Sequence, residues 1–386
     1  MLSSQNQNNA ILVLNSGSSS LKFGLYRQEG EDEGTLLEGS AEGVGRESGS
    51  IHIRSSDGTS LLSEEHILES QTEALQKLAS ALNAYLHVAP VAVGHRIVHG
   101  GPHLREHQRL TPEVLAQLQD AVHFAPLHIP QALTLVKQAQ KIFPKSLHFA
   151  CFDTAFHRTM PEVASHLPLP IRYFEQGVIR YGFHGLSCES VVDRLRNALP
   201  QRMIICHLGN GSSVTAVRNG KSIDTSMGLT PTGGVPMGTR SGDLDPGVML
   251  YMMRVEHLNS DALEEIVNRE SGLAGFSDGE SDMQCLLEQG TVGNLKAQLA
   301  IDAYAIAVRK YIGAFAALMS GVDLVVFTGG IGEHASEIRE RICDGLLFLG
   351  IDLSLGERGK VLILKAQEES QMSRICRQLL AVEPNS

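Results

Sequence analysis

The chain has 386 residues, of which 42% are hydrophobic, and a formal net charge of −11 at pH 7. This length and apolar content predict two globular domains of about 150–200 residues each and exclude a disordered protein. The negative charge argues against a nucleic-acid backbone as the main partner, and no apolar run approaches the ~20 residues that span a bilayer.

Six cysteines are scattered along the chain without a CxxC pair, at positions 151, 188, 206, 285, 343 and 376. Several lie in apolar runs, which is typical of reduced, buried thiols in a cytosolic protein. The first ten residues are polar and do not resemble a signal peptide. We therefore expect a cytoplasmic protein.

The segment 11–26 reads ILVLNSGSSSLKFGLY and predicts a strand, a small-residue turn and a second strand. Backbone N–H groups and hydroxyls of such a turn can bind an anion, and Lys22 adds positive charge, although a purely structural turn has the same composition. The pattern returns at 203–217 as MIICHLGNGSSVTAV. This repetition predicts an internal duplication with one phosphate-binding turn in each half.

Between the two hairpins, segment 29–60 reads as further strands, and residues 73–87 have helical spacing. Residues 91–101 (VAVGHRIVHGG) predict a buried strand that ends in a Gly-Gly turn. Arg96 within it needs a partner, either a structural carboxylate or an anionic ligand, because an unpaired buried guanidinium is costly. His95 and His99 are four residues apart, which brings side chains together on a helix, so we expect no metal pair here.

Helices are expected at 111–122 and 131–142, with a proline-bounded loop between them that contains His128. His128 is held in place by the prolines, but a solvent-facing loop histidine fits the same pattern. A strand at 147–151 is followed by Asp153, at the strand end where open α/β sheets bind their ligands. Capping of the next segment is the alternative role for Asp153.

The motif RYGFHGLS (180–187) precedes a helix expected at 188–199, and this helix ends the first half. His184 in this motif is either a packed structural residue or a site residue. His207 precedes the turn 208–211, the second candidate phosphate cradle. Gly-Lys-Ser at 220–222 belongs to an Asn-Gly hairpin return and is no P-loop, because Thr215 stands where that motif requires glycine.

Residues 224–245 contain five glycines and two prolines without apolar periodicity, which indicates a long functional loop around Arg240. Helices are expected at 246–255, 261–270 and 295–319, with a Gly/Ser/Asp loop at 272–282. A buried strand at 323–327 then opens into the turn TGGIGEH and a helix from residue 335. Strand, glycine turn and helix form nucleotide-binding geometry, although packing alone also selects such glycines.

A strand at 361–364 leads into a final helix that ends at Val382. Glu368 and Glu369 precede this helix. Two acidic residues stabilise a helix N-terminus in any case. A role near Mg²⁺ is the more specific alternative.

Together these motifs resemble the acetate kinase family of short-chain carboxylate kinases, which belongs to the superfamily of actin, sugar kinases and heat-shock chaperone ATPases. The resemblance runs from Ile11 to about Val382 and rests on LNSGSSSLK (14–22), HRIVHGG (95–101), APLHIP (125–130), FDTAFH (152–157), RYGFHG (180–185), HLGNGSS (207–213), GLTPTGG (228–234), GTRSGD (238–243) and FTGGIGE (327–333). It implies an α/β protein with a duplicated actin-like (ribonuclease H-like) βββαβαβα core, two domains around a nucleotide cleft, and a homodimer. The domains are expected at 1–155, with the C-terminal helix of about 370–386 packed back on the first, and at 156–369.

The resemblance also implies roles for individual residues. The proposed catalytic residues are Arg96, His128, Asp153, His184 and Arg240. Arg96 is also expected to bind the substrate carboxylate, beside a small alkyl pocket of Val98, Leu127, Phe183 and Pro231. The ATP phosphates are expected at Ser18, Ser20, Lys22, His207, Leu208, Gly209, Asn210 and Gly211. The adenosine is expected at Asp282, Met283, Gln284, Gly330, Ile331, Gly332, Glu333 and His334. Asn15 and Glu368 are expected near the metal.

The implied reaction is the reversible transfer of the ATP γ-phosphoryl group to acetate, giving acetyl phosphate and ADP, with Mg²⁺ or Mn²⁺. Propionate or butyrate is the alternative acceptor, and an actin-like or chaperone-like nucleotide switch or a sugar kinase is a more distant reading. The family usually has arginine at Gln284, asparagine at His334 and Gln367, threonine at Leu186 and histidine at Cys188. The first three departures bear on nucleotide preference and affinity, and the last two on the helix after His184.

Overall fold

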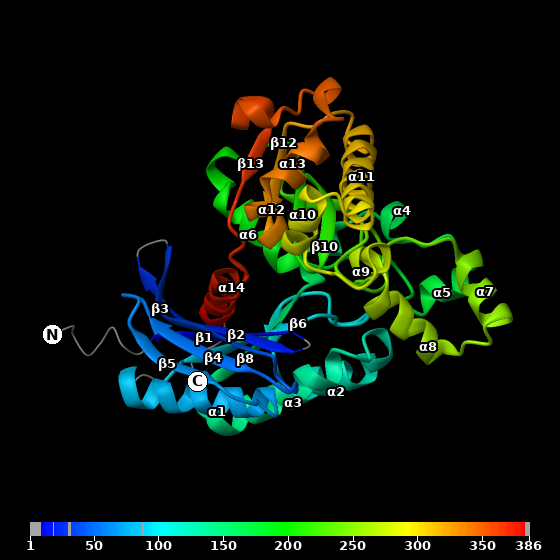
Figure 1. Ribbon diagram of the computed structural model, residues 1–386. Helices are drawn as coiled ribbons and strands as arrows, with labels where there is room; N and C mark the ends of the chain where they lie inside the picture. Colours follow the sequence, from blue (N-terminus) through cyan, green and yellow to red (C-terminus); the bar gives the residue numbers. More distant parts are fainter. Residues whose placement is uncertain (1–8, 18, 30–31, 87–88, 383–386) are drawn as a thin grey trace. The chain divides into compact units, whose positions relative to one another are not determined.

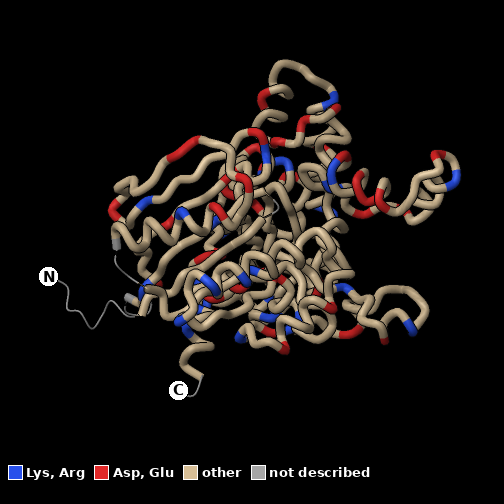
Figure 2. Tube along the Cα trace, turned by 90° about the horizontal axis from the view of Figure 1, so that it is seen from below, with Lys and Arg blue, Asp and Glu red and all other residues tan. Residues whose placement is uncertain are grey.

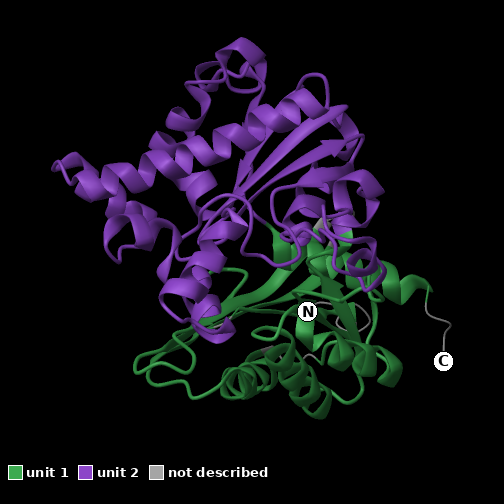
Figure 3. Cartoon of the chain, turned by 90° about the vertical axis from the view of Figure 1, so that its right-hand side faces the viewer, with its two compact units in different colours: residues 1–155, 367–386 green, residues 156–366 purple. Residues whose placement is uncertain are grey.

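The computed structural model describes residues 9–17, 19–29, 32–86 and 89–382. The chain divides into two compact units, one of residues 1–155 with 367–386 and one of residues 156–366 (Figure 3). Each unit has one sheet with helices on its two faces.

The first unit contains an eight-stranded sheet in the order β5-β4-β3-β2-β1-β6-β8-β7. Its strands are β1 (Ile11–Ser16), β2 (Ser20–Glu29), β3 (Asp32–Glu42), β4 (Ser50–Ser55), β5 (Ser60–Glu65), β6 (Ala92–Ile97), β7 (Gln108–Arg109) and β8 (Leu147–Phe152). Strands β1 to β5 form an antiparallel meander, while β6 pairs parallel with both β1 and β8. The carboxyl ends of β1, β6 and β8 therefore lie at one edge of the sheet.

Helices cover both faces of this sheet (Figure 1). The unit contains α1 (Gln71–Ala81), α2 (Pro112–Asp120), α3 (Ile129–Ile142) and α14 (Glu368–Val382), with the short turns η2 (Leu82–Leu86) and η3 (Ala121–Phe124). Successive side chains of a strand point to opposite faces of the sheet, so the unit has a core on each face. Leu12 and Leu14 pack with α1 and α3 on one face. On the other face, Val13 lies near Gly94 and Cys376 of α14. The last helix thus completes the first unit.

The second unit contains a five-stranded sheet in the order β11-β10-β9-β12-β13. Its strands are β9 (Arg202–Leu208), β10 (Ser212–Arg218), β11 (Lys221–Thr225), β12 (Leu324–Thr328) and β13 (Val361–Ile363). Antiparallel pairs join β9, β10 and β11, and parallel pairs join β9, β12 and β13. The run β3-β2-β1-β6-β8 in the first sheet has the same order and strand directions, which confirms the predicted duplication.

The helices of the second unit lie on both faces of its sheet and in the long connections between strands. They are α4 (Glu162–Ser165), α5 (Ile171–Glu175), α6 (Gly185–Arg194), α7 (Pro246–Val255), α8 (Ser260–Glu265), α9 (Gly272–Ser277), α10 (Met283–Thr291), α11 (Leu295–Leu318), α12 (Gly329–His334) and α13 (Ser336–Cys343), with the turns η5 (Arg196–Ala198), η6 (Ile266–Glu270), η7 (Leu347–Leu349) and η8 (Leu353–Gly359). A further turn, η4 (Ala155–Thr159), precedes α4.

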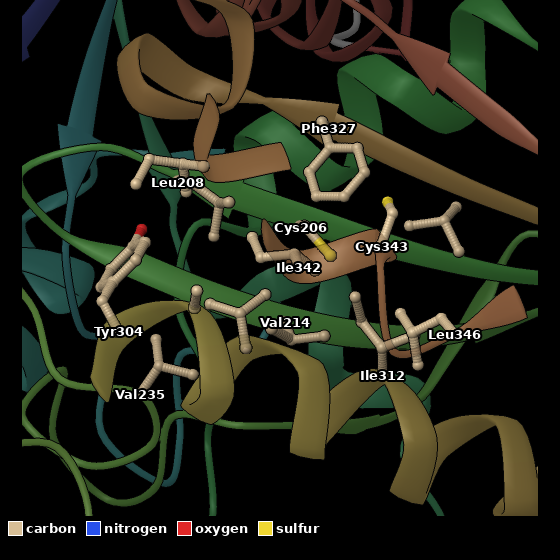
Figure 4. Close-up of a cluster of buried hydrophobic side chains, with 14 of the residues drawn as sticks. Cys206, Leu208, Val214, Val235, Tyr304, Ile312, Phe327, Ile342, Cys343 and Leu346 are labelled. Carbon is tan, nitrogen blue, oxygen red and sulfur yellow. The ribbon is translucent and has the colours of Figure 1, made fainter. Parts of the chain in front are cut away.

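The core of the second unit forms between its sheet and α11. Cys206, Leu208 and Val214 of the strands point toward Tyr304 and Ile312 of α11 (Figure 4). The alternate residues of β9 pack on the opposite face with α6. Each central strand is therefore buried on both sides, as in parallel α/β sheets.

Two segments expected as loops are short helices. In 272–282, α9 forms because Leu273 is fully buried against the α11 core. In the turn after β12, Gly329 adopts φ of +79° and α12 begins at once. A Cβ at Gly329 would lie 2.6 Å from the carbonyl oxygen of Leu208, so glycine is required for this approach and not for flexibility.

All six cysteines lie in the described residues and none forms a disulfide; Cys285 is exposed and the other five are buried. Among the described residues, no helix combines the length and apolar character of a membrane span. Lys and Arg are interspersed with Asp and Glu along the chain (Figure 2).

Two histidines in the first sheet predict a pH-dependent stability. His148 Nε2 donates to the Phe143 carbonyl, so its Nδ1 accepts from His95 Nε2, at 3.0 Å. Burial lowers the pKa of both imidazoles below 6.5, and His148 further lowers the pKa of His95. Because the unfolded chain binds more protons below pH 6.5, we expect the contribution of this pair to the free energy of unfolding to be constant above that pH. Below it the contribution should fall, by at most about 1.4 kcal/mol per pH unit for each group.

Urea unfolding followed by circular dichroism between pH 8 and pH 5 measures this slope. The double variant His95→Leu/His148→Leu should make this slope shallower, whatever its effect on stability at pH 8. An unchanged slope in the double variant would contradict the assignment to this pair.

Candidate active site

Four predicted site residues meet at the carboxyl ends of the first unit's parallel strands. Asn15 lies in β1, Arg96 in β6 and Asp153 directly after β8, and Glu368 begins α14. The Asn15 amide nitrogen donates to Glu368 Oε2 at 3.2 Å and to Glu369 Oε1 at 2.8 Å, and its oxygen accepts from Arg96 Nη1 at 3.0 Å. This asparagine therefore links the arginine to both carboxylates of α14.

Asp153 is the partner that Arg96 was expected to need. Its Oδ2 accepts from Arg96 Nε at 2.9 Å and from Nη2 at 2.5 Å. Burial alone would lower the pKa of Arg96, but the carboxylates of Asp153 and Glu368 outweigh it and raise that pKa. The guanidinium thus stays charged, with one edge held by Asp153 and Nη1 directed to Asn15.

The oxygen atoms of this network suit a hard divalent cation. Asp153 Oδ1 is buried and has no hydrogen-bond partner among the described residues, and Glu368 adds a carboxylate. Mg²⁺ usually keeps several waters and takes one or two protein carboxylates. Accordingly, no cluster of three or more His, Cys, Asp or Glu ligands occurs in the described chain. The residues fit the cation that the family uses, while Asn15 and Glu368 as its ligands stay a prediction.

The turn after β1 is fixed from outside the hairpin. Gln71 of α1 donates to the carbonyls of Gly17 at 2.7 Å and Ser20 at 3.2 Å. Lys22 is exposed and stands opposite Asn15 in the β1–β2 register. Ser18 lies outside the described residues. No local pattern marks Gln71, because its contacts with the turn span more than fifty residues.

The remaining predicted residues of the first unit are less enclosed. His128 is the N-cap residue of α3, so this helix begins earlier than expected and includes the end of the predicted loop. Leu127 beside it is 41% exposed, and Val98 is half-buried.

In the second unit, His184 lies at the N-terminus of α6 with a left-handed φ of 57°. Its Nδ1 lies 3.0 Å from Ser213 Oγ, and its ring centroid lies 4.3 Å from that of His207. His207 Nδ1 in turn lies 2.8 Å from Ser187 Oγ. Two serines, neither of them predicted, therefore orient two predicted site histidines.

Gly211 leaves a space between an imidazole and a guanidinium. A Cβ built on it would lie 3.2 Å from His184 Nε2 and 3.5 Å from Arg240 Nη1. Arg240 Nη1 also donates to the carbonyl of Pro231 at 3.2 Å. The turn, two of the proposed catalytic residues and one predicted pocket residue are thus brought together within this unit.

Gly211→Ala is therefore expected to reduce activity although the substitution is small. The methyl group would displace His184 by a few tenths of an ångström. Because a misplacement of about 1 Å costs about 10²-fold in rate, we expect a loss below that limit. Steady-state kinetics of phosphoryl transfer measure the loss. Gly313→Ala is the control, because a Cβ there meets no atom within 4 Å; equal rates for the two variants would contradict the prediction.

The two glycine turns of the second unit adjoin each other. Gly329 packs on Leu208, and Gly330 has no atom within 4 Å of its Cβ position. Glu333 Oε1 accepts from the backbone of Gly329 at 3.0 Å and of Ala366 at 2.8 Å, so its carboxylate holds the turn. The neighbouring residues differ in exposure: Ile331 is half-buried, Gly332 is buried, and Asn210 and His334 are exposed.

The predicted adenosine segment begins α10. Asp282 caps this helix by accepting from the backbone of Gln284 and Cys285. Gln284 is exposed, and its amide donates to Glu288. Met283 is buried in the apolar core of the unit, so its side chain does not line a surface site.

The duplicated α/β core, with half-buried Arg96 at a strand end and half-buried Arg240 beside the glycine turn at Gly211, has the actin-like fold, a class that includes phosphotransferases. A model of the acetokinase family matches residues 10–373. An acetate kinase of Treponema denticola is 41% identical over 363 residues, which are 91% of this chain and 90% of that protein. An acetate kinase of Staphylococcus aureus is 39% identical over 391 residues, covering 94% and 97%.

Solved structures agree. The acetate kinase of Porphyromonas gingivalis superposes with a TM-score of 0.85 at 35% identity, covering 96% of this chain and 100% of that one. A propionate kinase of Francisella tularensis gives a TM-score of 0.86 at 32% identity, covering 95% and 98%. The chain belongs to the acetokinase family, whose members are kinases that phosphorylate a carboxylate. The predicted family and fold class are confirmed; the roles of individual residues stay predictions.

Proposed function

We propose that this chain transfers the γ-phosphoryl group of ATP to acetate, reversibly, giving acetyl phosphate and ADP. The observation that carries the proposal is the setting of two arginines. Arg96 lies near the end of β6 and forms an ion pair with Asp153. Arg240 lies beside His184 and the glycine turn at Gly211. A carboxylate is already anionic at pH 7 and needs no strong base. The reaction requires charge neutralisation and alignment, because two anions must meet.

Each residue has its own task in this reaction. Arg96 offers the guanidinium edge that Asp153 does not occupy, and Arg240 offers a second planar fork for oxyanions. His184 donates from Nε2 to an equatorial phosphoryl oxygen, while backbone N–H groups of the two glycine turns bind the remaining phosphates. A divalent ion held near Asn15 and Glu368 would supply positive charge against the phosphoryl oxygens. Asp153 serves to orient Arg96 and water, since no proton has to be removed.

Propionate or butyrate is the second candidate acceptor, favoured by the similarity to a propionate kinase. One methylene changes binding by only about 1–3 kcal/mol. The proposed alkyl pocket of Val98, Leu127, Phe183 and Pro231 would have to discriminate at that level.

A hydroxamate assay for acyl phosphate tests the proposal with acids from formate to butyrate, compared by kcat/KM. We expect the largest kcat/KM for acetate, and no phosphorylation of glucose. ATP hydrolysis without acyl phosphate would support the nucleotide-switch reading and contradict the proposal.

We also propose a cytoplasmic homodimer. Helix α7 has no buried residue, and Val248, Leu250, Tyr251, Met253 and Val255 are exposed along it. A second copy of the chain would remove these apolar side chains from water. Sedimentation equilibrium should then give twice the chain mass of 41.8 kDa.

A further inference from the structure

His157 closes the motif FDTAFH, and the mechanism above gives it no role. It lies in η4, is fully buried, and both ring nitrogens are bonded. Nε2 lies 2.9 Å from the Phe183 carbonyl oxygen and Nδ1 lies 3.0 Å from Ser222 Oγ. Because a carbonyl only accepts, Nε2 carries the hydrogen, and Nδ1 accepts from the Ser222 hydroxyl.

The carbonyl that His157 binds belongs to the residue before His184. The backbone is left-handed on both sides of Phe183, with φ of +74° at Gly182 and +57° at His184. A non-glycine residue in this conformation is strained by about 1–2 kcal/mol and persists only where its surroundings fix it. A Cβ at Gly182 would lie 2.7 Å from His157 Cγ, so the imidazole supports this turn directly.

The ring of His184 is held from its other side. Ser213, fully buried in β10, lies 3.0 Å from Nδ1. Nε2 is then directed toward the space over Gly211 that Arg240 also borders. The backbone of His184 is therefore fixed through His157, and its ring through Ser213.

We propose that His157 is a positioning residue for His184, acting through the Phe183 carbonyl. The inference rests on the proposed function of His184 in phosphoryl transfer. Burial lowers the pKa of His157 to about 4, so the imidazole stays neutral at working pH and keeps its hydrogen on Nε2. A purely structural histidine would affect stability, whereas a positioning residue affects kcat at unchanged ATP affinity.

The test compares His157→Leu, which removes the donor, with His157→Gln, whose amide can still donate to the Phe183 carbonyl. We expect His157→Leu to lower kcat about 10–100-fold with an unchanged dissociation constant for a non-hydrolysable ATP analogue, and His157→Gln to recover most of kcat. The matched control is His148→Leu, another buried neutral histidine, which should reduce stability and leave kcat unchanged. The proposal would be overturned if His157→Leu and His157→Gln lost kcat equally. It would also be overturned if the control His148→Leu lost as much kcat as His157→Leu.

A second readout does not depend on turnover. Modification of His184 by diethyl pyrocarbonate, followed by peptide mass spectrometry, should be faster in His157→Leu than in the wild type. If the wild type phosphorylates none of the acids but the modification rate of His184 still changes in His157→Leu, the positioning role stands and the proposed function fails. If His157→Leu changes neither this modification rate nor kcat, the positioning role is refuted. If His157→Leu does not fold, Ser222→Ala replaces it, because it removes only the hydroxyl that bonds Nδ1; we then expect a several-fold loss of kcat.

Discussion

Arg240→Ala should lower kcat by about 10²–10³-fold and leave binding of an ATP analogue intact. The guanidinium borders the space over Gly211 and is held by the Pro231 carbonyl, so it is placed to neutralise charge that develops during transfer. Loss of one such preorganised donor typically costs about 3–4 kcal/mol in the transition state. Stopped assays of acyl phosphate and calorimetry with the analogue separate the two effects.

Arg240→Lys should recover only part of the rate, because an ammonium group keeps the charge but not the planar fork. Arg269→Ala is the control, since Arg269 is exposed and pairs only with Glu265 of its own segment among the contacts described. Full turnover in Arg240→Ala would remove Arg240 from the mechanism.

Asp153→Ala should reduce the free energy of unfolding by about 3–5 kcal/mol. Asp153 is 1% exposed and Arg96 is 18% exposed, so the substitution leaves a largely buried guanidinium without its main partner. The double variant Arg96→Met/Asp153→Ala should regain part of this loss, because it removes the uncompensated charge. The chain contains no tryptophan, so circular dichroism is the suitable probe.

Glu265→Ala provides the comparison with an exposed pair. The Arg269–Glu265 contact lies at the surface, and such pairs contribute at most about 1 kcal/mol. If Asp153→Ala and Glu265→Ala destabilise equally, the Arg96–Asp153 pair does not have the structural importance assigned to it.

Local patterns predicted the elements that carry their own sequence signature. The two Gly-Ser-Ser hairpins, the strands around them and the need of Arg96 for a partner all follow from residues close together in the chain. Asp153 was expected at a strand end, and the parallel order of β1, β6 and β8 explains why it meets Arg96. The duplication was visible because both halves repeat one turn.

Contacts between distant segments could not be predicted in this way. Gln71, Ser213 and His157 hold site residues from other elements, and no local periodicity marks them. The segments of α9 and α12 were expected as a Gly/Ser/Asp loop and a glycine turn, because glycine marks turns. Gly272 and Gly329 pack closely on Met237 and Leu208 at the start of these two short helices. The prolines around His128 concealed its place at the N-cap position of α3.

The place of α14 in the first unit has a consequence for folding during synthesis. Asn15 can form its hydrogen bond with Glu368 only after a further 353 residues have been synthesised. At about 5–20 residues per second, this delay is on the order of 20–70 seconds. During synthesis the second unit has all of its strands before the first unit has its last helix. The N-terminal part of the nascent chain should therefore expose the sheet face that α14 later covers, and depend on chaperones until translation is complete.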